Sequence, residues 1–338
     1  MYPDIPFWLS IVFMLGGFAL LAWSSDLFVD ASATLAHALG LSPFIVGMVI
    51  IGFGTSAPEL CVSVFSGLAD HANLSLGNAY GSCVFNIAVI LGVAAMIAPI
   101  KVKPLTAMVA GPALAGISLF SLWVLYDGVC GRGEAVILLV AFAVIMPLYG
   151  WFDQKTRGLP SPRKEKFQPE NVPLWRTAML LLAGLAVLIA SAHVLVWGAV
   201  DFARFMNVSD LLIGLTIVAV GTSLPELASA IASARRKEHE FVLGNIIGSN
   251  LFNMLAVVGL ATVISPVTAE NGGFSRSVLD RDIPLLTLLS LSITLFGANW
   301  RHLRFNGRIT RVAALIWLVV FVVYAAVMIY GEVQVPKA

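Results

Sequence analysis

The sequence contains an internal repeat, and this repeat constrains the fold more than any other feature. Residues 44–92 align with residues 211–259 without a gap, at an offset of 167 positions, and 17 of the 49 aligned residues are identical. "GFGTSAPEL" falls on "AVGTSLPEL", and "LGNAYGSCVFN" falls on "LGNIIGSNLFN". A gapless match of this length indicates a duplicated unit, so the chain is expected to fold as two related halves.

Composition places both halves in a membrane. Hydrophobic residues make up 59% of the 338 residues and charged residues only 12%, which is typical of a polytopic membrane protein and excludes a soluble domain. With about 20 apolar residues per span, the hydropathy predicts ten membrane segments: 6–35, 42–67, 74–98, 105–125, 133–152, 175–204, 210–233, 241–265, 283–299 and 312–330.

The ten predicted segments form two groups of five. We expect a first repeat over residues 1–152, a polar linker over 153–173 and a second repeat over 174–338. Because each group has an odd number of spans, the second copy is inverted relative to the first. The expected fold class is an all-α integral membrane protein with about ten transmembrane helices, in two inverted five-helix repeats with broken helices at the midplane. Such repeats are typical of secondary transporters.

Lysine and arginine residues predict the orientation. Fifteen of the twenty lie in connections on the linker side, and the hairpin "ARRKEHEF" of the second copy has three whereas "LADHANL" of the first has none. The positive-inside rule then places residues 153–173 in the cytoplasm and both termini outside, in a cell (inner) membrane. The N-terminus lacks a basic region and a cleavage site, so we expect a retained first helix.

Each copy carries a proline and a glutamate inside an apolar run. Pro58 and Pro225 lack an N–H and must open the helix just before Glu59 and Glu226. An ionised carboxylate at the centre of a bilayer costs about 2.5–3.5 kcal/mol or more, and no neighbouring Lys or Arg compensates either glutamate. We therefore expect bound cations to compensate them.

Calcium suits this arrangement because it takes six to eight oxygen ligands. Glu59 and Glu226, each binding through both oxygens, would supply four of them. The carbonyls of Thr55 and Thr222, exposed by the helix breaks, would supply two more. The pattern thus predicts a calcium site made from both copies.

Uncharged oxygen-bearing side chains surround the two glutamates at helical spacing. Such groups suit sodium, which carries less charge than calcium. The candidate sodium ligands are the hydroxyls of Thr55, Ser56, Ser82, Thr222, Ser223 and Ser249, and the asparagines on the same helix faces are Asn78, Asn86, Asn245 and Asn253. The alternative is that each hydroxyl bonds only its own helix backbone.

The two blocks "GTSAPEL…GNAYGSCVFN" and "GTSLPEL…GNIIGSNLFN" resemble the alpha repeats of the sodium/calcium exchanger family of the cation/calcium antiporter superfamily. The resemblance implies alternating access, in which two long helices slide over an eight-helix core. It implies calcium at Glu59, Glu226 and the carbonyls of Thr55 and Thr222. It also implies two sodium sites. The first consists of Thr55, Ser56 and Ser82 with the Gly52 carbonyl, and the second of Thr222, Ser223 and Ser249 with the Ala219 carbonyl. Asn86 and Asn253 would line the centre.

Two positions depart from the family pattern. Members often have an aspartate where this chain has Asn253, so the centre loses a carboxylate here. Cys83 stands opposite Asn250, at a position that we expect to face packing. Both copies keep GTSxPE, which the proton-coupled branch of the superfamily usually replaces, so the resemblance favours sodium coupling.

Other functions fit the residues less well. A calcium/proton or other divalent-cation/proton antiporter stays open, because two neighbouring glutamates repel and one could carry a proton. A cation channel is disfavoured by the inverted repeats, and an intramembrane hydrolase by the absence of a His or Lys base beside Ser56 or Ser223. We expect no enzymatic activity and no cofactor. The expected partners are calcium and sodium ions, possible protons and the lipid bilayer, and a net charge of +1 indicates no nucleic acid.

Overall fold

The computed structural model describes residues 6–68, 72–103, 106–156, 173–206, 219–268, 276–298 and 307–334. These residues are helical except for short connections and two brief strands. The predictions made for most of the linker and for the start of the seventh segment, at 210–218, lie outside the described residues.

The first half begins with a long helix and continues with broken or π-bulged helices. Gly40, with φ +62°, ends the first helix, and the Ser42 side chain accepts from Ile45 N at 2.9 Å to begin the second. The elements are α1 (Phe7–Ala38), α2 (Pro43–Val46), η1 (Gly47–Ile51), α3 (Gly52–Thr55), α4 (Ala57–Leu68), α5 (Ala72–Phe85), η2 (Asn86–Leu91), α6 (Gly92–Ile97), β1 (Ile100–Lys101), η3 (Thr106–Ala110), α7 (Gly111–Val124) and α8 (Arg132–Thr156), where η denotes a π-helical segment.

The described helices of the second half follow the same order, but its strand comes before the last helix rather than after the central one. Its elements are α9 (Leu174–Phe205), α11 (Ala219–Thr222), α12 (Leu224–Arg235), α13 (His239–Leu251), η5 (Phe252–Val257), α14 (Val258–Ile264), η7 (Val278–Asp282), α15 (Ile283–Gly297), β2 (Arg308–Ile309) and α16 (Arg311–Gln334).

These helices confirm the predicted fold class. By length and composition, six helices among the described residues can cross a membrane, and the pair Pro43–Thr55 and Ala57–Val64, bent by 41°, makes a seventh span if counted as one. The other three predicted spans correspond to η3 with α7, η7 with α15, and α11 with α12. The broken helices lie where the proline in each repeat predicts them.

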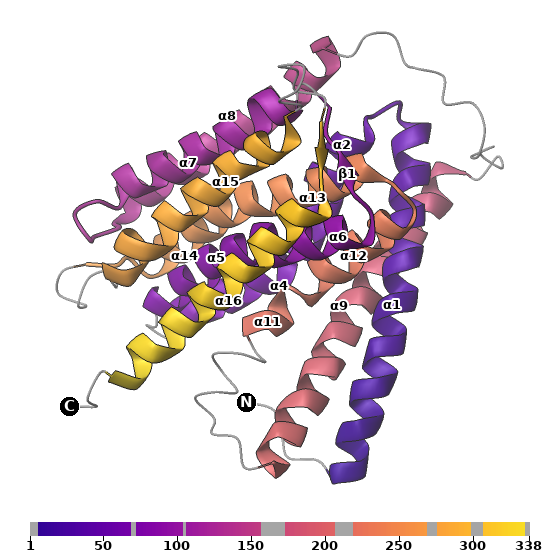
Figure 1. The fold of residues 1–338 in the computed structure, drawn as a ribbon, viewed down its shortest axis with the longest axis horizontal. Coiled ribbons are helices and arrows are strands. Elements are labelled where there is room, and N and C mark those ends of the chain that lie inside the picture. The colour runs from indigo at the N-terminus through magenta and orange to yellow at the C-terminus, as the bar shows by residue number, and fades with distance from the viewer. Residues whose placement is uncertain are drawn as a thin grey trace.

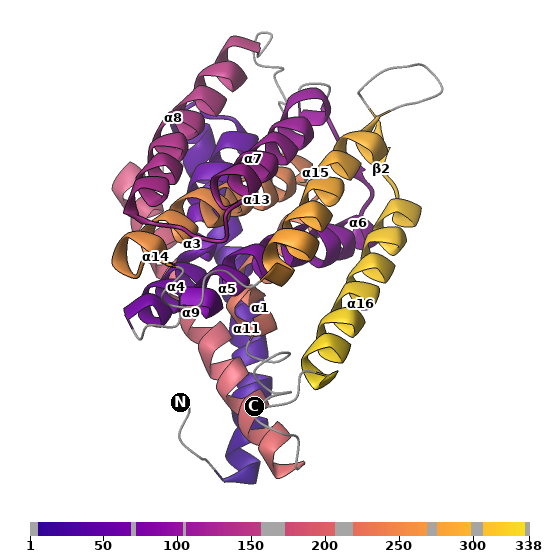
Figure 2. The same ribbon diagram turned by 90° about the vertical axis from the view of Figure 1, so that its left-hand side faces the viewer.

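The two long helices α1 and α9 lie side by side and project from the rest of the molecule (Figures 1 and 2). Glycines allow their close approach: a Cβ at Gly17 would lie 2.8 Å from the Leu195 backbone nitrogen, and one at Gly184 would lie 3.2 Å from the Phe28 Cα. These two contacts exchange under the 167-residue repeat, so the pair is itself symmetric.

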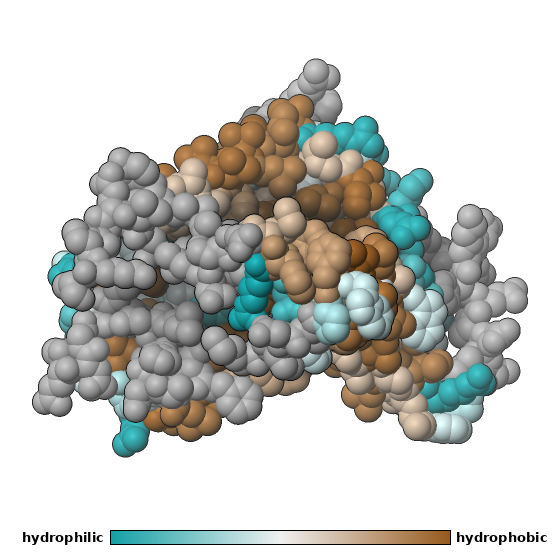
Figure 3. Space-filling view, turned by 90° about the horizontal axis from the view of Figure 1, so that it is seen from below, coloured by the Kyte–Doolittle hydropathy of each residue, from teal (hydrophilic) through white to brown (hydrophobic). Residues whose placement is uncertain are grey.

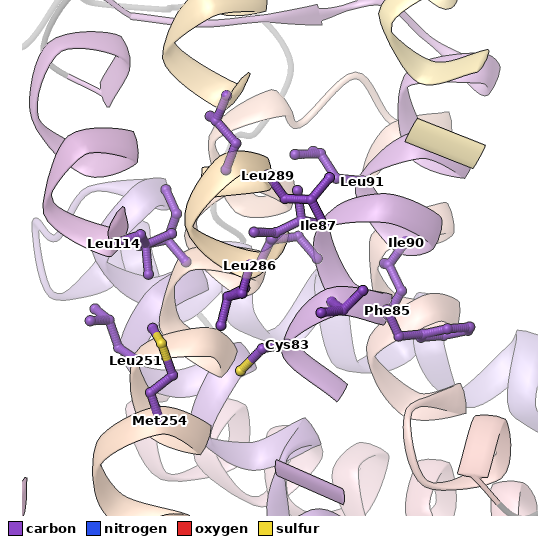
Figure 4. Close-up of a cluster of buried hydrophobic side chains, with 14 of the residues drawn as sticks. Cys83, Phe85, Ile87, Ile90, Leu91, Leu114, Leu251, Met254, Leu286 and Leu289 are labelled. Carbon is purple, nitrogen blue, oxygen red and sulfur yellow. The ribbon is translucent and has the colours of Figure 1, made fainter. Parts of the chain in front are cut away.

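The remaining helices enclose a core to which both halves contribute. Figure 4 shows Cys83 and Ile87 from α5 and η2 beside Leu251, Met254 and Leu286 from the second half. All five side chains are fully buried. The two halves therefore form one packed body.

Short strand pairs join the halves at their ends. β1 pairs with β2 in antiparallel register, with Ile100 opposite Ile309. The equivalent place in the other half has an isolated bridge between Cys130 and Val267, with N···O distances of 2.8 and 2.9 Å. Each bridge connects the residue after one central helix to the residue before the last helix of the other half.

An arginine reinforces each of these junctions. Arg311 Nε donates to the Met96 carbonyl at 3.0 Å, and Arg132 Nε donates to the Val263 carbonyl at 3.3 Å. Met96 and Val263 are repeat partners near the ends of α6 and α14, whose last carbonyls lack helical partners. The arginines satisfy one such carbonyl at each end of the core.

The outer surface is largely apolar, as a lipid-facing surface requires (Figure 3). In the coloured part of that view, hydrophilic residues form small groups at the edges and one group near the centre. The exposed apolar side chains on the long outer helices include Leu15, Phe18, Val140, Leu182, Val319 and Val322.

Candidate ion-binding site

In the first half, a helix break at Ser56 positions the side chains of the GTSAPE motif. α3 ends at Thr55, Ser56 adopts φ −81° and ψ 7°, and α4 starts at Ala57 with Glu59 in its first turn. Thr55, Ser56 and Glu59 are fully buried. The break therefore places a carboxylate and two hydroxyl side chains inside the protein.

The second half repeats this geometry. α11 ends at Thr222, Ser223 adopts φ −92° and ψ 10°, and α12 carries Pro225 and Glu226 in its first turn. Glu226 is fully buried, Ser223 is 1% exposed, and Thr222 is half-buried. Ala219, whose carbonyl is a predicted sodium ligand, is described only through its backbone.

The two halves exchange hydrogen bonds at the glutamates. Ser56 Oγ donates to Glu226 Oε1 at 2.9 Å, and Ser223 Oγ donates to Glu59 Oε1 at 2.8 Å. Each glutamate thus takes its serine from the other repeat. The structure brings the four residues, predicted from two distant stretches of sequence, into one site.

Each carboxylate also has an oxygen without a partner. Glu59 Oε2 and Glu226 Oε2 are buried and make no hydrogen bond within the described part of the chain. No Lys, Arg or His side chain among those residues forms an ion pair with either glutamate. Two buried carboxylates with free oxygens and no basic neighbour have the chemistry of a site for a hard cation.

The predicted sodium ligands lie close to this pair. Ser82 Oγ is 3.4 Å from Ser223 Oγ, and Ser249 Oγ donates to the Gly52 carbonyl at 3.2 Å. Thr55 Oγ1 donates to the Ile51 carbonyl at 2.9 Å, as the alternative of backbone bonding expects. The hydroxyls therefore form part of the same polar interior in this structure.

Three asparagines lie at the centre. Asn86 Nδ2 donates to Asn250 Oδ1 at 3.0 Å, while neither side-chain atom of the fully buried Asn253 has a partner among the described residues. Asn86 belongs to the π-helical segment η2, and Asn253 belongs to η5. Such π-helical segments often occur at functional sites. The expectation that Cys83 faces packing is confirmed, because its side chain is fully buried in the hydrophobic core, whereas its repeat partner Asn250 bonds Asn86.

Comparison with known proteins agrees with this geometry. Residues 9–149 and 176–330 match the family model "Sodium/calcium exchanger protein". The chain belongs to the sodium/calcium exchanger family. This family member is 37% identical to the putative antiporter CaxA of Alkalimonas amylolytica, over 93% of this chain and 97% of that protein.

Further relatives match at nearly full length. The sodium/calcium exchanger MaX1 of Methanosarcina acetivorans is 28% identical, over 92% of this chain and 98% of that one. A solved structure of the sodium-calcium exchanger NCX_Mj, soaked with sodium and strontium, superimposes with a TM-score of 0.78 at 29% identity, covering 94% of this chain and 98% of that chain.

Two features of this exchanger-family member were not foreseen from the sequence. Asn245 contacts residues of both helix breaks, although its sequence signal was only its place on the same helix face as Ser249. Arg236, at the end of α12, pairs with Asp26 and Asp30 of α1. The basic hairpin signalled orientation, but nothing in the sequence indicated which acidic residues it meets.

Proposed function

We propose that this protein is a secondary antiporter that exchanges sodium for calcium across the membrane by alternating access. The observation that carries the proposal is the pair of buried glutamates, each hydrogen-bonded by a serine of the other repeat and neither paired with a basic side chain among the described residues. Relatives named as sodium/calcium exchangers support it.

Calcium binds between the two glutamates. Glu59 and Glu226 supply carboxylate oxygens from opposite sides, and the carbonyls of Thr55 and Thr222 complete the site. With both glutamates ionised, one calcium ion leaves the site neutral, which removes most of the cost of burying the two charges.

Sodium occupies flanking positions. The first is formed by Thr55, Ser56 and Ser82 with the Gly52 carbonyl, and the second by Thr222, Ser223 and Ser249 with the Ala219 carbonyl. Asn86 and Asn253 line the centre between them. Because sodium and calcium compensate the same two carboxylates, the two ions exclude each other, as antiport requires.

The protein lies in the cell (inner) membrane with both termini outside and the 153–173 linker in the cytoplasm. The distribution of Lys and Arg supports this orientation. α1 and α9 then slide across the core to open the site to either side. Their close-packed, symmetric contact supports movement of the two helices as a single unit.

One experiment tests the function. The purified protein is reconstituted into liposomes loaded with sodium, and uptake of radioactive calcium is measured after dilution into sodium-free medium. We expect uptake that depends on the outward sodium gradient and not on an outward proton gradient of equal size. Full uptake without sodium, driven by the proton gradient, would replace the proposal with calcium/proton antiport.

A further inference from the structure

Asn245 lies at the junction of the two helix breaks and has no assigned part in the sites described above. It belongs to α13 and is 1% exposed. Its Nδ2 donates to Ser229 Oγ at 3.2 Å and to the Glu226 carbonyl at 3.5 Å. Since a carbonyl can only accept, this contact fixes the orientation of the amide.

The other end of the amide faces two candidate sodium ligands. Asn245 Oδ1 lies 3.4 Å from Thr55 Oγ1 and 3.4 Å from Ser249 Oγ, so each hydroxyl can donate to it. Thr55 belongs to the first half and Ser249 to the second. One buried side chain therefore connects the hydroxyls of both halves to the backbone of a glutamate.

Each hydroxyl has one proton and a choice of two acceptors. Thr55 Oγ1 can donate to the Ile51 carbonyl at 2.9 Å or to Asn245, and Ser249 Oγ can donate to the Gly52 carbonyl at 3.2 Å or to Asn245. The Gly52 carbonyl also accepts from Ser56 N at 3.2 Å. Both lone pairs of the Gly52 oxygen are thus engaged while Ser249 donates to it.

We infer that Asn245 is a positioning residue for sodium. When Ser249 turns its proton to Asn245, the Gly52 carbonyl regains a lone pair, and the lone pairs of the hydroxyl stay directed at the ion. Asn245 is likewise the alternative acceptor for the hydroxyl proton of Thr55. Calcium, which relies on the carboxylates, needs this rearrangement much less. The inference rests on the sodium ligands proposed above.

The repeat provides a matched control. Asn78 is the partner of Asn245 in the first half, but it is half-buried, and the hydrogen bond described for its Nδ2 is with Ser63 Oγ at 3.5 Å. The same substitution at the two positions therefore separates the contacts of Asn245 from the general loss of a polar side chain in the core.

The test uses the full-length protein purified in detergent. Calcium binding is first measured by calorimetry without sodium, and then the sodium concentration that halves calcium binding is determined. For Asn245→Ala we expect this sodium concentration to rise roughly 3- to 10-fold, the effect of losing one buried hydrogen-bond acceptor. We expect the sodium-free calcium affinity to change less than about twofold, which also shows that the variant is folded.

Two further variants decide the interpretation. Asn245→Gln keeps an accepting oxygen and a donating amide without adding charge, so sodium competition should stay nearer the wild-type value than in Asn245→Ala, and Asn78→Ala should shift it by less than about twofold. Equal shifts at Asn78 and Asn245, equal losses of sodium and calcium affinity, or a larger loss of sodium competition in Asn245→Gln than in Asn245→Ala would each overturn the inference.

Ser249→Ala separates this inference from the sodium-site proposal. If Ser249→Ala weakens sodium competition while Asn245→Ala does not, the role of Asn245 is wrong and the sodium site stands. If Ser249→Ala leaves sodium competition unchanged, the sodium site itself is wrong.

Discussion

The segments α5 and α13 carry the same motif but have different neighbours among the described residues. A Cβ at Gly244 or Gly248 would overlap the carbonyl oxygens of Phe44 and Met48 in α2 and η1. A Cβ at the partner glycines Gly77 and Gly81 meets no heavy atom within 4 Å in the described part of the chain, and both glycines are half-buried rather than buried.

This difference cannot come from the motif, because the two glycines have the same spacing in both copies. The first broken helix packs closely against α13, and in the proposed orientation this contact lies on the cytoplasmic side. The repeat counterpart of its contact residues, 211–215, lies outside the described residues. Variants in the two halves therefore test whether the two motifs are packed alike.

The largest effect is expected at the glutamates, where the two halves should be equivalent. Glu59→Gln and Glu226→Gln each remove a buried charge from the cation, a loss of about 3–5 kcal/mol or about 100-fold or more in calcium affinity. Calcium uptake into liposomes should be abolished in both variants while the protein stays monodisperse. Substantial uptake by either variant would remove that glutamate from the site.

Alanine substitutions at Gly248 and Gly81 test whether the two motifs are packed alike. Gly248→Ala introduces a methyl group into a contact with no spare room and should destabilise the folded protein by about 1–3 kcal/mol. Gly81→Ala should change the stability by less than about 0.5 kcal/mol. Thermal unfolding in detergent measures both, and equal melting temperatures would show that the two faces are packed alike in solution.

Serine substitutions sharpen the comparison at the ion ligands. Ser82→Ala and Ser249→Ala should each raise the sodium concentration needed for half-maximal exchange roughly 3- to 10-fold, because each removes one uncharged oxygen. Calcium affinity without sodium should change less than about twofold. An equal loss for both ions would assign the serines to the calcium site instead.

The central asparagines lack the carboxylate that relatives often have, and Asn253→Asp restores it in one half. The added charge should strengthen calcium binding at neutral pH by roughly tenfold, about 1.4 kcal/mol. It should also make binding weaken as the pH is lowered, because protonation removes the new charge. Calcium titrations at several pH values measure this, and identical curves for variant and wild type would show that Asn253 does not face the ions.

The smallest effect is expected at the contact of α1 with the core. The Asp30 side chain is 45% exposed where it pairs with Arg236, and Asp26 pairs with the same guanidinium. Exposed ion pairs contribute about 0–1 kcal/mol, so Asp30→Asn should leave the exchange rate within about twofold. A severe loss of exchange would mean that this ion pair governs the position of α1.

Much of the fold was accessible from the sequence, since span length and apolar composition are set by the bilayer. The segment predicted at 74–98 is the helical run 72–97, and the one predicted at 241–265 is 239–264. The breaks followed from proline chemistry. The residues of the candidate site were accessible for a different reason, because the duplication marks the same polar positions twice.

The hydrogen bonds between the serine of one half and the glutamate of the other could not be predicted from the sequence. A repeat shows that Ser56 and Ser223 are equivalent, but not that each donates to the glutamate of the other copy, because this depends on how the inverted halves meet. The strands β1 and β2 have two residues each, too few for any periodic pattern. The close contact of Gly244 and Gly248 with Phe44 and Met48 was not accessible either, because a small-residue spacing does not show which helix approaches it.

The strand pairs and arginines at the two junctions have a mechanical consequence. Because the end of α6 is tied to the start of α16, and the end of α14 to the start of α8, the core behaves as a frame braced at both rims. A braced frame resists a clamshell opening of its halves, since opening either rim breaks backbone bonds there. The helices α1 and α9 lie outside this bracing, as the sliding movement proposed for them requires.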